Sequence, residues 1–572
     1  MRRLLCPLFA PLLACPVLGQ VSELTVTAQV GSWEIEPGQV VPAWTFDGTL
    51  PGPELRVNQG DLVRFRLRNE LPEPTTVHFH GLPVPLAADG VPGVSGPPIG
   101  VGQEFTYEFL ADTPGTYWYH PHVELQIDRG MYGSIVVVPA APVDPEFDRE
   151  YTIVLDDWLP GDPVVVSNPF YSDFLINGRT SAGQSPLTVQ EGEVVRLRFV
   201  NAAASTPFVV AVDGHPMTVT HSDGQRVVPF VTEAIPIGQG ERYDVTITAD
   251  QPGSWSIAAS HLMDRSTTLV RAVLEYQGTA QTPPSASYVP PFLSSGSLLT
   301  YAQLASAEPA PLPAAPDRVH ALSLDVQGGP GGPKWMINGQ AFPNADPILV
   351  ATGEEVRFDV TNNTHHHHPM HIHGHFFRLV GSAGGNAAPL IKDTLLVDPL
   401  AQGGAHQAYF TADNPGNWPY HCHHIYHMAL GMMRMVQYEG SDLDADGLAD
   451  AKDYDPQEDH PILGTSGLGG DYVIGTNIEL SAQWPSGEVV QFALGAELPL
   501  AIPLEPLGSL ALWPFAFVGA AVADATDRAA LSLALPNDPS LPGQVVGLQA
   551  IASHGTLPGG LRLSKPLRVT VH

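Results

Sequence analysis

The sequence predicts an all-β protein of several domains, and three observations lead to that fold class. The chain has 572 residues, which is too long for one hydrophobic core. It contains 56 Gly and 57 Pro but only 15% charged residues, a balance that favours many short strands and turns over long helices. The third observation is an internal repeat: three segments carry the same landmarks in the same order.

Each repeat contains three landmarks, and their spacing agrees closely from one copy to the next. The first is a small turn, at Phe46-Asp47-Gly48, Ile176-Asn177-Gly178 and Ile337-Asn338-Gly339. The second is a Gly before an alternating apolar strand, at Gly60, Gly192 and Gly353. The third is Ala-Asp-x-Pro-Gly-x-aromatic, beginning at Ala111, Ala249 and Ala412. Three copies of one β-rich unit favour a Greek-key β-sandwich for each.

These landmarks divide the chain into domains and connections. The three β domains are expected at residues 20–140, 141–278 and 317–440. Between the second and third lies a Pro/Ala/Ser-rich linker, residues 279–316. An acidic run follows at residues 441–460, and residues 461–572 alternate again, which predicts a C-terminal β domain of unknown role, available for contact with a cell surface or another protein.

The N-terminus reads as a signal peptide, residues 1–19, which predicts export to the periplasm, cell surface or medium. Arg2 and Arg3 precede an apolar run that is too short for a membrane span, and cleavage is expected after Gly19. A lipoprotein-like cleavage that leaves Cys15 lipidated is the alternative. Removal of the peptide leaves Cys422 as the remaining thiol, so no intrachain disulfide forms.

The net charge of the chain excludes some classes of binding partner. The chain has 26 Lys and Arg against 59 Asp and Glu, a formal net charge of −33. Such acidity argues against a nucleic-acid partner or an anionic membrane surface.

The stretch from His421 to Met432 carries the strongest chemical signal. A thiolate with two imidazoles and a weak axial Met is the ligand set of a blue copper site, and Cys422, His427 and Met432 supply three of those four ligands. Successive side chains of a strand point to opposite faces, so His421 and His423 face away from Cys422 toward a different metal. A His-rich loop around a buried thiol is the alternative.

Paired histidines elsewhere indicate where that second metal site lies. The pairs are His78/His80, His120/His122, His371/His373 and His421/His423, and all belong to the first and third copies. The corresponding end of the second copy, Ala258 to His261, has no such pair. A His-x-His strand puts both imidazoles on one face. The first and third copies are therefore expected to meet across a metal cluster, with the second as a spacer that shapes the interface.

With these motifs, residues from about 23 to 440 resemble a three-domain multicopper oxidase of the laccase type. The resemblance implies three cupredoxin-like domains and four copper ions. The type 1 ligands would be His368, Cys422 and His427, with Met432 axial. The type 2 copper would take His78 and His371, and the type 3 pair would take His80, His120, His122, His373, His421 and His423.

The resemblance also implies a function. A laccase-like enzyme oxidises phenolic or aromatic donors by one electron at the type 1 copper and passes electrons through Cys422 to His421 and His423, where dioxygen is reduced to water. Its partners are a small reducing substrate and dioxygen. A metal-ion oxidase acting on cuprous, ferrous or manganous ions is the first alternative, although Leu379 to Leu400 lacks the Met-rich insertion of cuprous specialists. A non-catalytic copper-binding or assembly protein is the second.

Three further positions carry hypotheses about protons and donors. Asp89 aligns with an acidic residue that assists proton delivery in the family, or it is a turn residue before Gly90. Many bacterial relatives have a carboxylate where this chain has Met428, which puts a second proton relay in doubt. The run His365 to His367 forms either a peripheral metal site or a solvated loop. Asp393 either anchors a donor or ends a strand.

The acidic run has the spacing of a calcium loop. Positions 1, 3, 5, 9 and 12 are filled by Asp442, Asp444, Asp446, Asp450 and Asp453, with Gly447 at position 6. This pattern resembles a thrombospondin type 3 or dockerin repeat and predicts calcium as a further cofactor. A disordered acidic linker is the alternative.

Overall fold

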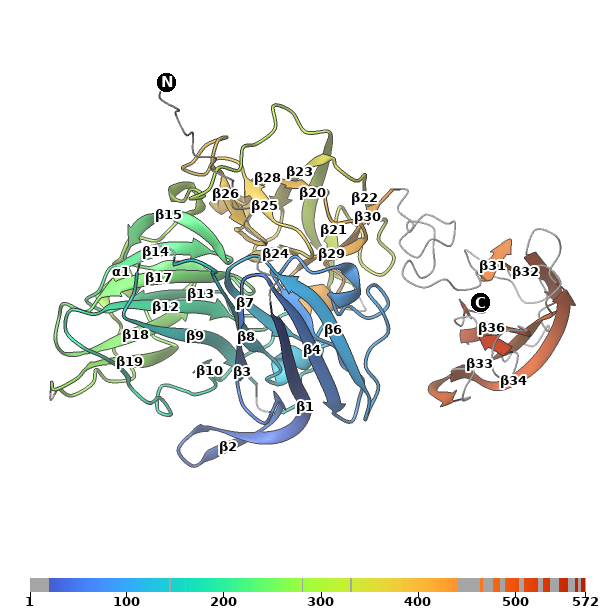
Figure 1. Ribbon diagram of the computed structural model, residues 1–572, viewed down its shortest axis with the longest axis horizontal. Coiled ribbons are helices and arrows are strands. Elements are labelled where there is room, and N and C mark those ends of the chain that lie inside the picture. The colour runs from blue at the N-terminus through green and yellow to red at the C-terminus, as the bar shows by residue number, and fades with distance from the viewer. Residues whose placement is uncertain are drawn as a thin grey trace, which may run out of the picture. The chain divides into compact units, whose positions relative to one another are not determined.

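The computed structural model describes residues 20–142, 146–159, 161–279, 281–329 and 332–439, together with the backbone of the strands between Leu463 and Thr570. Two compact units divide the chain, residues 1–441 and 442–572. In the first unit three β-sandwiches follow one another, coloured blue, green and yellow to orange in Figure 1. The all-β class is confirmed.

The first sandwich contains two sheets. One has the order β2-β1-β4-β6, and the other has the order β3-β8-β7-β5. The strands are β1 (Val21–Glu36), β2 (Gln39–Phe46), β3 (Gly52–Asn58), β4 (Asp61–Glu70), β5 (His78–His80), β6 (Glu104–Ala111), β7 (Gly115–His120) and β8 (Gly133–Val138). Apolar side chains of both sheets, such as Phe65 and Ile135, share one core.

The second sandwich has sheets of order β10-β9-β12-β17-β14-β15 and β11-β19-β18-β13-β16. Its strands are β9 (Arg149–Trp158), β10 (Asp173–Ile176), β11 (Leu187–Val189), β12 (Val194–Asn201), β13 (Phe208–Val212), β14 (Met217–Ser222), β15 (Gln225–Thr232), β16 (Ile235–Ile237), β17 (Arg242–Thr248), β18 (Ser254–His261) and β19 (Val270–Tyr276).

The third sandwich has sheets of order β21-β20-β23-β28-β25-β26 and β22-β30-β29-β24-β27. Its strands are β20 (Arg318–Gln327), β21 (Lys334–Ile337), β22 (Ile348–Val350), β23 (Glu355–Asn362), β24 (His368–Ile372), β25 (Phe377–Leu379), β26 (Leu390–Lys392), β27 (Thr394–Val397), β28 (Ala405–Thr411), β29 (Asn417–Cys422) and β30 (Met433–Tyr438). The second and third sandwiches share one continuous set of buried apolar residues.

Helical segments are short. They are η1 (Leu86–Ala88), η2 (Gln126–Arg129), α1 (Pro291–Ser295), η3 (Tyr301–Gln303), η4 (Leu400–Gln402) and α2 (Ile425–Ala429). Within the described part of the chain, none of the helices has the length and apolarity that a membrane crossing requires.

The internal repeat is visible in the backbone. Asp47, Asn177 and Asn338 all adopt left-handed φ values, 54°, 49° and 55°, each before a Gly that is also left-handed. Each side-chain Oδ1 accepts a hydrogen bond of 2.7 Å from the strand N–H of an earlier residue. The second and third landmarks also meet, because the N–H groups of Gly60, Gly192 and Gly353 donate to the carbonyls of Ala111, Ala249 and Ala412.

The Pro/Ala/Ser-rich connection is packed rather than free. Leu293 of α1 is fully buried, and α1 contacts β13 and β18 of the second sandwich. Tyr301 donates from its hydroxyl to Glu241 Oε1 at 2.6 Å and accepts from Leu396 N–H at 2.8 Å. The connection thereby joins the second and third sandwiches through its own side chains.

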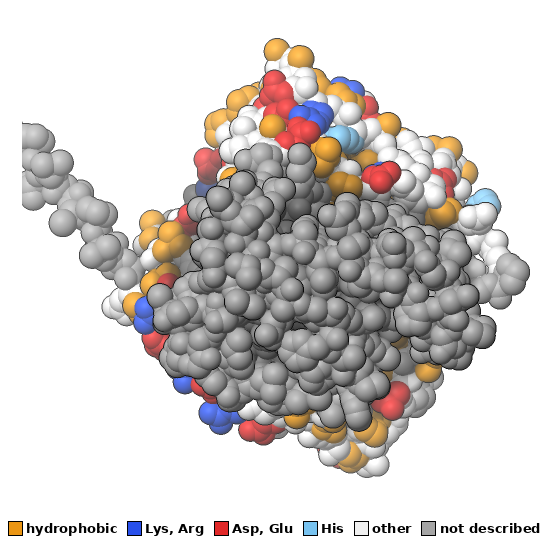
Figure 2. All heavy atoms as spheres, turned by 90° about the vertical axis from the view of Figure 1, so that its right-hand side faces the viewer, with side chains coloured by type: hydrophobic (Ala, Val, Ile, Leu, Met, Phe, Trp, Pro, Cys, Tyr) orange, Lys and Arg blue, Asp and Glu red, His pale blue; other side chains and the backbone are white. Residues whose placement is uncertain are grey.

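The surface of the first unit mixes charges of both signs. Figure 2 shows acidic, basic and apolar side chains side by side around the visible part of one face. Arg64 pairs with Glu108 at 2.7 Å, and Arg318 pairs with Glu439 at 2.8 Å. Exposed pairs of this kind contribute little to stability, because water and salt screen them.

The second unit is described by its backbone. β31 (Leu463–Ser466), β32 (Asn477–Gln483) and β35 (Arg528–Ala534) form one sheet. The other sheet contains β33 (Val489–Pro503), β34 (Ser509–Val522), β36 (Val545–Ser553), β37 (Leu561–Leu563) and β38 (Leu567–Thr570). The expected signal peptide and calcium loop lie outside the described residues.

Candidate metal centres and donor pocket

Strand pairing brings the predicted histidine pairs together two by two. In the first sandwich β5 lies antiparallel to β7, with His78 opposite His120. In the third sandwich β24 lies antiparallel to β29, with His371 opposite His421. Each sandwich therefore presents neighbouring His-x-His segments.

The two sets of histidines face each other across the interface of the first and third sandwiches. The rings of His78 and His373 stack with centroids 3.9 Å apart, and those of His80 and His371 stack at 3.7 Å. All eight predicted cluster ligands meet there, and all are buried except His122, which is half-buried. The structure thus brings the histidine pairs of the first and third copies together, and a metal cluster between them stays a prediction.

In most of these histidines one ring nitrogen is held by an oxygen acceptor. The pairs are His78 Nδ1 with Asp89 O (2.9 Å), His371 Nδ1 with Asp393 O (3.0 Å), His120 Nδ1 with Pro121 O (3.0 Å), His421 Nδ1 with Cys422 O (3.0 Å), His373 Nδ1 with Asp89 Oδ2 (2.9 Å) and His80 Nε2 with Asp393 Oδ1 (3.2 Å). A hydrogen bond at one nitrogen fixes the tautomer and leaves the other nitrogen with its lone pair.

The opposite nitrogens point inward and lack protein partners. Among the described residues, five ring nitrogens of the cluster histidines are buried without any hydrogen-bond partner: His78 Nε2, His80 Nδ1, His122 Nε2, His371 Nε2 and His423 Nδ1. Others face one another, with Nε2 atoms 3.1 Å apart in His373 and His421 and 3.4 Å apart in His120 and His423. Two nitrogens bound to one metal at about 2.0–2.1 Å would lie roughly 3 Å apart.

Electrostatics agree with a metal-binding role. Burial, reinforced by neighbouring imidazoles, lowers the pKa values of His120, His122 and His423 well below the usual range. The rings are therefore neutral at ordinary pH and offer lone pairs. Neutral imidazole is a good ligand for copper, so the donor set fits the predicted metal.

A separate site lies on the other side of Cys422. His368 Nδ1 is 3.5 Å from Cys422 Sγ, His427 Nδ1 is 3.8 Å from the same sulfur, and the two nitrogens are 3.2 Å apart. Met432 is fully buried, and its carbonyl accepts from the Cys422 N–H at 3.0 Å. These are the four residues expected for the type 1 site.

The Cys422 thiol needs a cation beside it before it can lose its proton. Burial raises the pKa of this thiol well above its ordinary value, so the thiolate does not form unaided. A bound metal supplies the missing positive charge and releases the proton. Thr364 Oγ1 lies 2.7 Å from His368 Nε2 and orients that ring with Nδ1 toward the sulfur.

Asp89 reaches the cluster directly. Its side chain is fully buried, one carboxylate oxygen is 2.9 Å from His373 Nδ1, and the other is 3.1 Å from His78 Nδ1. The turn before Gly90 places this carboxylate between the rings of His78 and His373, and its role in proton delivery stays a prediction.

Asp393 is not a donor anchor, and that hypothesis was wrong. The side chain is fully buried and accepts two hydrogen bonds from Arg242, at 2.8 and 2.6 Å. Although burial opposes ionisation, Arg242 and hydrogen bonds from His371 and His80 hold the pKa of Asp393 well below its usual value. A carboxylate in this position orients ligands and cannot meet a donor.

The second sandwich shapes the interface through residues that sequence reasoning did not identify. Gly240 has φ +87°, and a Cβ added there would lie 2.8 Å from His80 Cε1. Arg242 is fully buried beside it and bonds Asp393 across the interface. No motif marks these residues, because their role depends on how the second sandwich docks against the cluster.

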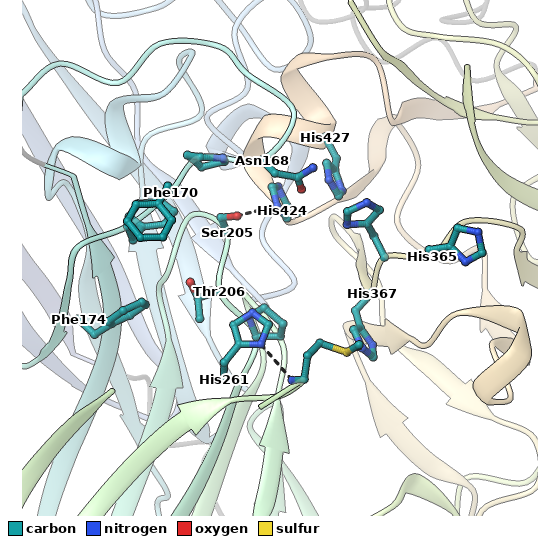
Figure 3. A pocket seen from close by; sticks show the side chains of 15 residues that line it. Asn168, Phe170, Phe174, Ser205, Thr206, His261, His365, His367, His424 and His427 are labelled. Carbon is teal, nitrogen blue, oxygen red and sulfur yellow. Dashed lines mark hydrogen bonds between the residues drawn. The ribbon is translucent and has the colours of Figure 1, made fainter. Parts of the chain in front are cut away.

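A pocket of about 320 Å³ opens beside the type 1 site (Figure 3). It is lined by Phe170, Phe174 and Thr206 of the second sandwich region and by His424 and His427 of the third. His424 and His427 stack in parallel with centroids 3.6 Å apart, and Ser205 Oγ holds His424 Nε2 at 2.7 Å. His427 Nε2 is buried and, among the described residues, without a hydrogen-bond partner.

The three residues of the run His365 to His367 differ in exposure, and a peripheral metal site there stays a prediction. His365 and His366 are exposed, as in a solvated loop. The side chain of His367 is only 7% exposed and pairs with Asp398, Nδ1 to Oδ1, at 3.0 Å.

Comparison with known proteins agrees with this geometry. Multicopper oxidase family models match residues 27–142, 149–279 and 315–442. The multicopper oxidase MmcO of Mycobacterium tuberculosis is 34% identical over 465 residues, covering 74% of this chain and 88% of the relative. A copper resistance protein A homolog of Pseudomonas syringae pv. tomato is 27% identical over 75% of this chain and 95% of its own length. The solved structure of a laccase from Botrytis aclada is similar with a TM-score of 0.65 and 25% identity, covering 74% of this chain and 88% of that one.

Cys422→Ser separates the two sites. Serine removes the sulfur that His368 and His427 approach but leaves His421 and His423 on the other side of the strand. We expect the copper-loaded variant to lose the intense thiolate-to-copper visible absorption and all turnover while it retains most cluster copper, as measured by absorption spectroscopy and metal analysis. A variant that keeps the blue band contradicts the assignment of Cys422.

Proposed function

This chain belongs to the multicopper oxidase family, and from that premise we propose that it is laccase-like, oxidising phenols or related small aromatic donors and reducing dioxygen to water. The observation that carries the proposal is His427. Its Nδ1 faces Cys422 Sγ, while its unpartnered Nε2 is buried at the aromatic-lined pocket. One ring thus joins the donor side to the thiol.

We assign four copper ions, one to His368, Cys422, His427 and Met432, and three to the histidine cluster. Copper bound there would supply one-electron transfer from the donor and dioxygen reduction. The completeness of the ligand set favours an enzyme over a copper-binding or assembly protein, whose signature would be a missing cluster ligand.

The pocket fits a small ring. Its volume of about 320 Å³ lies at the lower end of the range for ligand pockets, roughly 300–1,000 Å³. Phe170 and Phe174 offer apolar faces to an aromatic donor. His427 Nδ1 is directed at the metal site, so the proton of the neutral ring sits on Nε2. This N–H can donate a hydrogen bond to the oxygen of a phenolic substrate.

Covalent bonds link the donor side to the cluster. Cys422 is bonded through the main chain to both His421 and His423, and the His421 and Cys422 side chains leave β29 on opposite faces. Asp89 lies at the far side of the cluster, in contact with His78 and His373. We assign Asp89 to proton delivery. A second proton relay is not offered at Met428 of α2, because methionine has no carboxylate.

Oxygen uptake with different donors tests the proposal. The copper-loaded chain should consume dioxygen with a phenol, and the Cys422→Ser variant should not, because its donor side is disconnected. A non-phenolic dye and cuprous ion are measured beside the phenol. Uptake with cuprous ion but not with either aromatic donor would replace the laccase-like proposal with the metal-ion oxidase.

Asp89→Asn separates proton delivery from electron entry. Asn keeps the shape but cannot release and regain a proton, so reoxidation by dioxygen should slow at least about tenfold, in line with the roughly 10²–10⁴-fold contribution of a positioned acid or base. Anaerobic bleaching of the blue colour by substrate should stay near normal. Stopped-flow absorption follows both steps, and equal slowing of the two would indicate structural damage instead.

We also propose that residues 1–19 direct export and that the acidic loop 442–453 binds calcium. Five carboxylates within one loop repel one another, and calcium takes six to eight oxygens. Calcium binding would stabilise the ordered form of the loop by mass action.

Chelation of calcium should therefore increase protease cleavage between residues 441 and 460. The oxidation rate should stay constant, because every predicted copper ligand precedes residue 433. Asp446→Ala should behave like the chelated protein. Gel analysis after limited proteolysis gives the result, and the absence of protection by calcium in the unaltered chain would leave an acidic linker.

A further inference from the structure

The ring of His427 lies between two other aromatic rings. His424 stacks on it in parallel, with centroids 3.6 Å apart and an interplanar angle of 1°. Trp335 of β21 also stacks on it, with centroids 3.8 Å apart at 27°. Two rings that both lie face-on within 4 Å of a third ring must cover its opposite faces, because they would overlap on one face. All three side chains are buried, so rings rather than water cover both faces of His427.

Trp335 is held against α2, the short helix that carries His427. Its main-chain N–H donates to the carbonyl of Leu430, directly after the helix, at 3.0 Å. Its indole Nε1–H donates to Ser167 Oγ at 3.0 Å. The same indole meets the ring of His368 edge-on, with centroids 5.3 Å apart at 68°. One side chain therefore contacts both imidazoles that are expected at the type 1 site.

His424 is held from the second sandwich. Ser205 Oγ lies 2.7 Å from its Nε2, and Figure 3 shows this contact beside the donor pocket. The next main-chain N–H, that of Ile425, donates to the carbonyl of Ala204 at 3.0 Å. Asp157 in turn accepts from the N–H groups of Ala204 and Ser205, at 2.8 and 3.1 Å. Hydrogen bonds across the interface thus fix both the ring of His424 and the start of α2.

Stacking on both faces has two consequences for the type 1 site. It prevents the His427 ring from tilting, so Nδ1 keeps its direction toward Cys422 Sγ, 3.8 Å away. It also excludes water, and the shell around a metal site controls the local dielectric and thereby the reduction potential. A thiolate with Cu(II) carries one net positive charge and a thiolate with Cu(I) carries none. Exclusion of water therefore favours the reduced form and raises the potential.

We propose that His424 and Trp335 are positioning residues that clamp the ring of His427 and keep the potential of the type 1 site high. A site of higher potential accepts electrons from phenols that release them less readily, so the clamp widens the range of donors. The clamp stands on the geometry of the three rings. Its effect on the donor range rests on the oxidase function proposed above.

Redox titration of the copper-loaded chain, without phenol or dioxygen, tests the clamp. We expect His424→Ala, which opens one face of His427 to water, to lower the type 1 potential by at least about 59 mV, a tenfold change in a one-electron equilibrium constant. His424→Phe keeps a flat ring and should recover at least about half of that shift. The matched control His365→Ala changes an exposed residue of the nearby loop and should leave the potential unchanged.

Electron paramagnetic resonance gives a second readout that does not depend on turnover. The type 1 signal of His424→Ala should be broader than that of the unaltered chain, because the freed His427 ring adopts several orientations. Trp335→Leu removes the other stacked ring and should change the potential and the signal in the same directions. If this fully buried substitution prevents folding, the pair His424→Ala and His424→Phe decides.

Stopped-flow bleaching by a series of phenols tests the donor range. His424→Ala should slow bleaching at least about tenfold with the weakest reductant and less with stronger ones, whereas general damage would slow all of them equally and contradict the proposal. An unchanged potential and signal in His424→Ala overturns the clamp. An equal fall in His424→Ala and His424→Phe also overturns it, because the stacked ring would then be irrelevant. The expected shifts in a chain that takes up no oxygen with phenol would instead contradict the oxidase function.

Discussion

The structure depends on keeping a set of buried imidazoles neutral, each in one tautomer. Burial alone would leave their polar nitrogens at a cost of roughly 1–3 kcal/mol each. The fold lowers that cost on one side of the rings with carbonyls and carboxylates, among them those of Asp89 and Asp393. Several other ring nitrogens, among them His78 Nε2 and His371 Nε2, are buried without a protein partner, and bound metal ions would remove that cost. The free energy of metal binding would therefore contribute to the stability of the interface between the first and third sandwiches.

Buried charges between the second and third sandwiches support the same ligand rings. Arg242 and Lys392 are both fully buried, and together they face the carboxylates of Asp223, Glu241 and Asp393. Removing one member of a buried ion pair typically costs about 3–5 kcal/mol, because the partner charge is left unpaired. The network therefore locks the second and third sandwiches in one arrangement. That arrangement is what presents Asp393 to His80 and His371.

Most of this fold and the paired histidines were predictable from local patterns, whereas the assignment of each ligand to a copper came from the resemblance to the family. The repeated Asp/Asn-Gly turns specify backbone that other residues rarely adopt, and His-x-His spacing specifies a shared strand face. What could not be predicted depends on docking between copies. The sequence around Asp393 does not indicate that Arg242 binds its carboxylate, so a donor anchor was a reasonable hypothesis for it. His367 belonged to a run of identical residues, and the contact that distinguishes it comes from Met263, more than a hundred residues earlier.

Residues that are adjacent in the sequence point their side chains into different sites. In β29, His421 and Cys422 leave opposite faces of one strand, so a single peptide unit separates the cluster from the type 1 thiol. His367 and His368 show the same division, because His368 faces Cys422 while His367 turns to Asp398 and Met263. The short covalent step between the two sites therefore follows from the alternation of side chains along one strand.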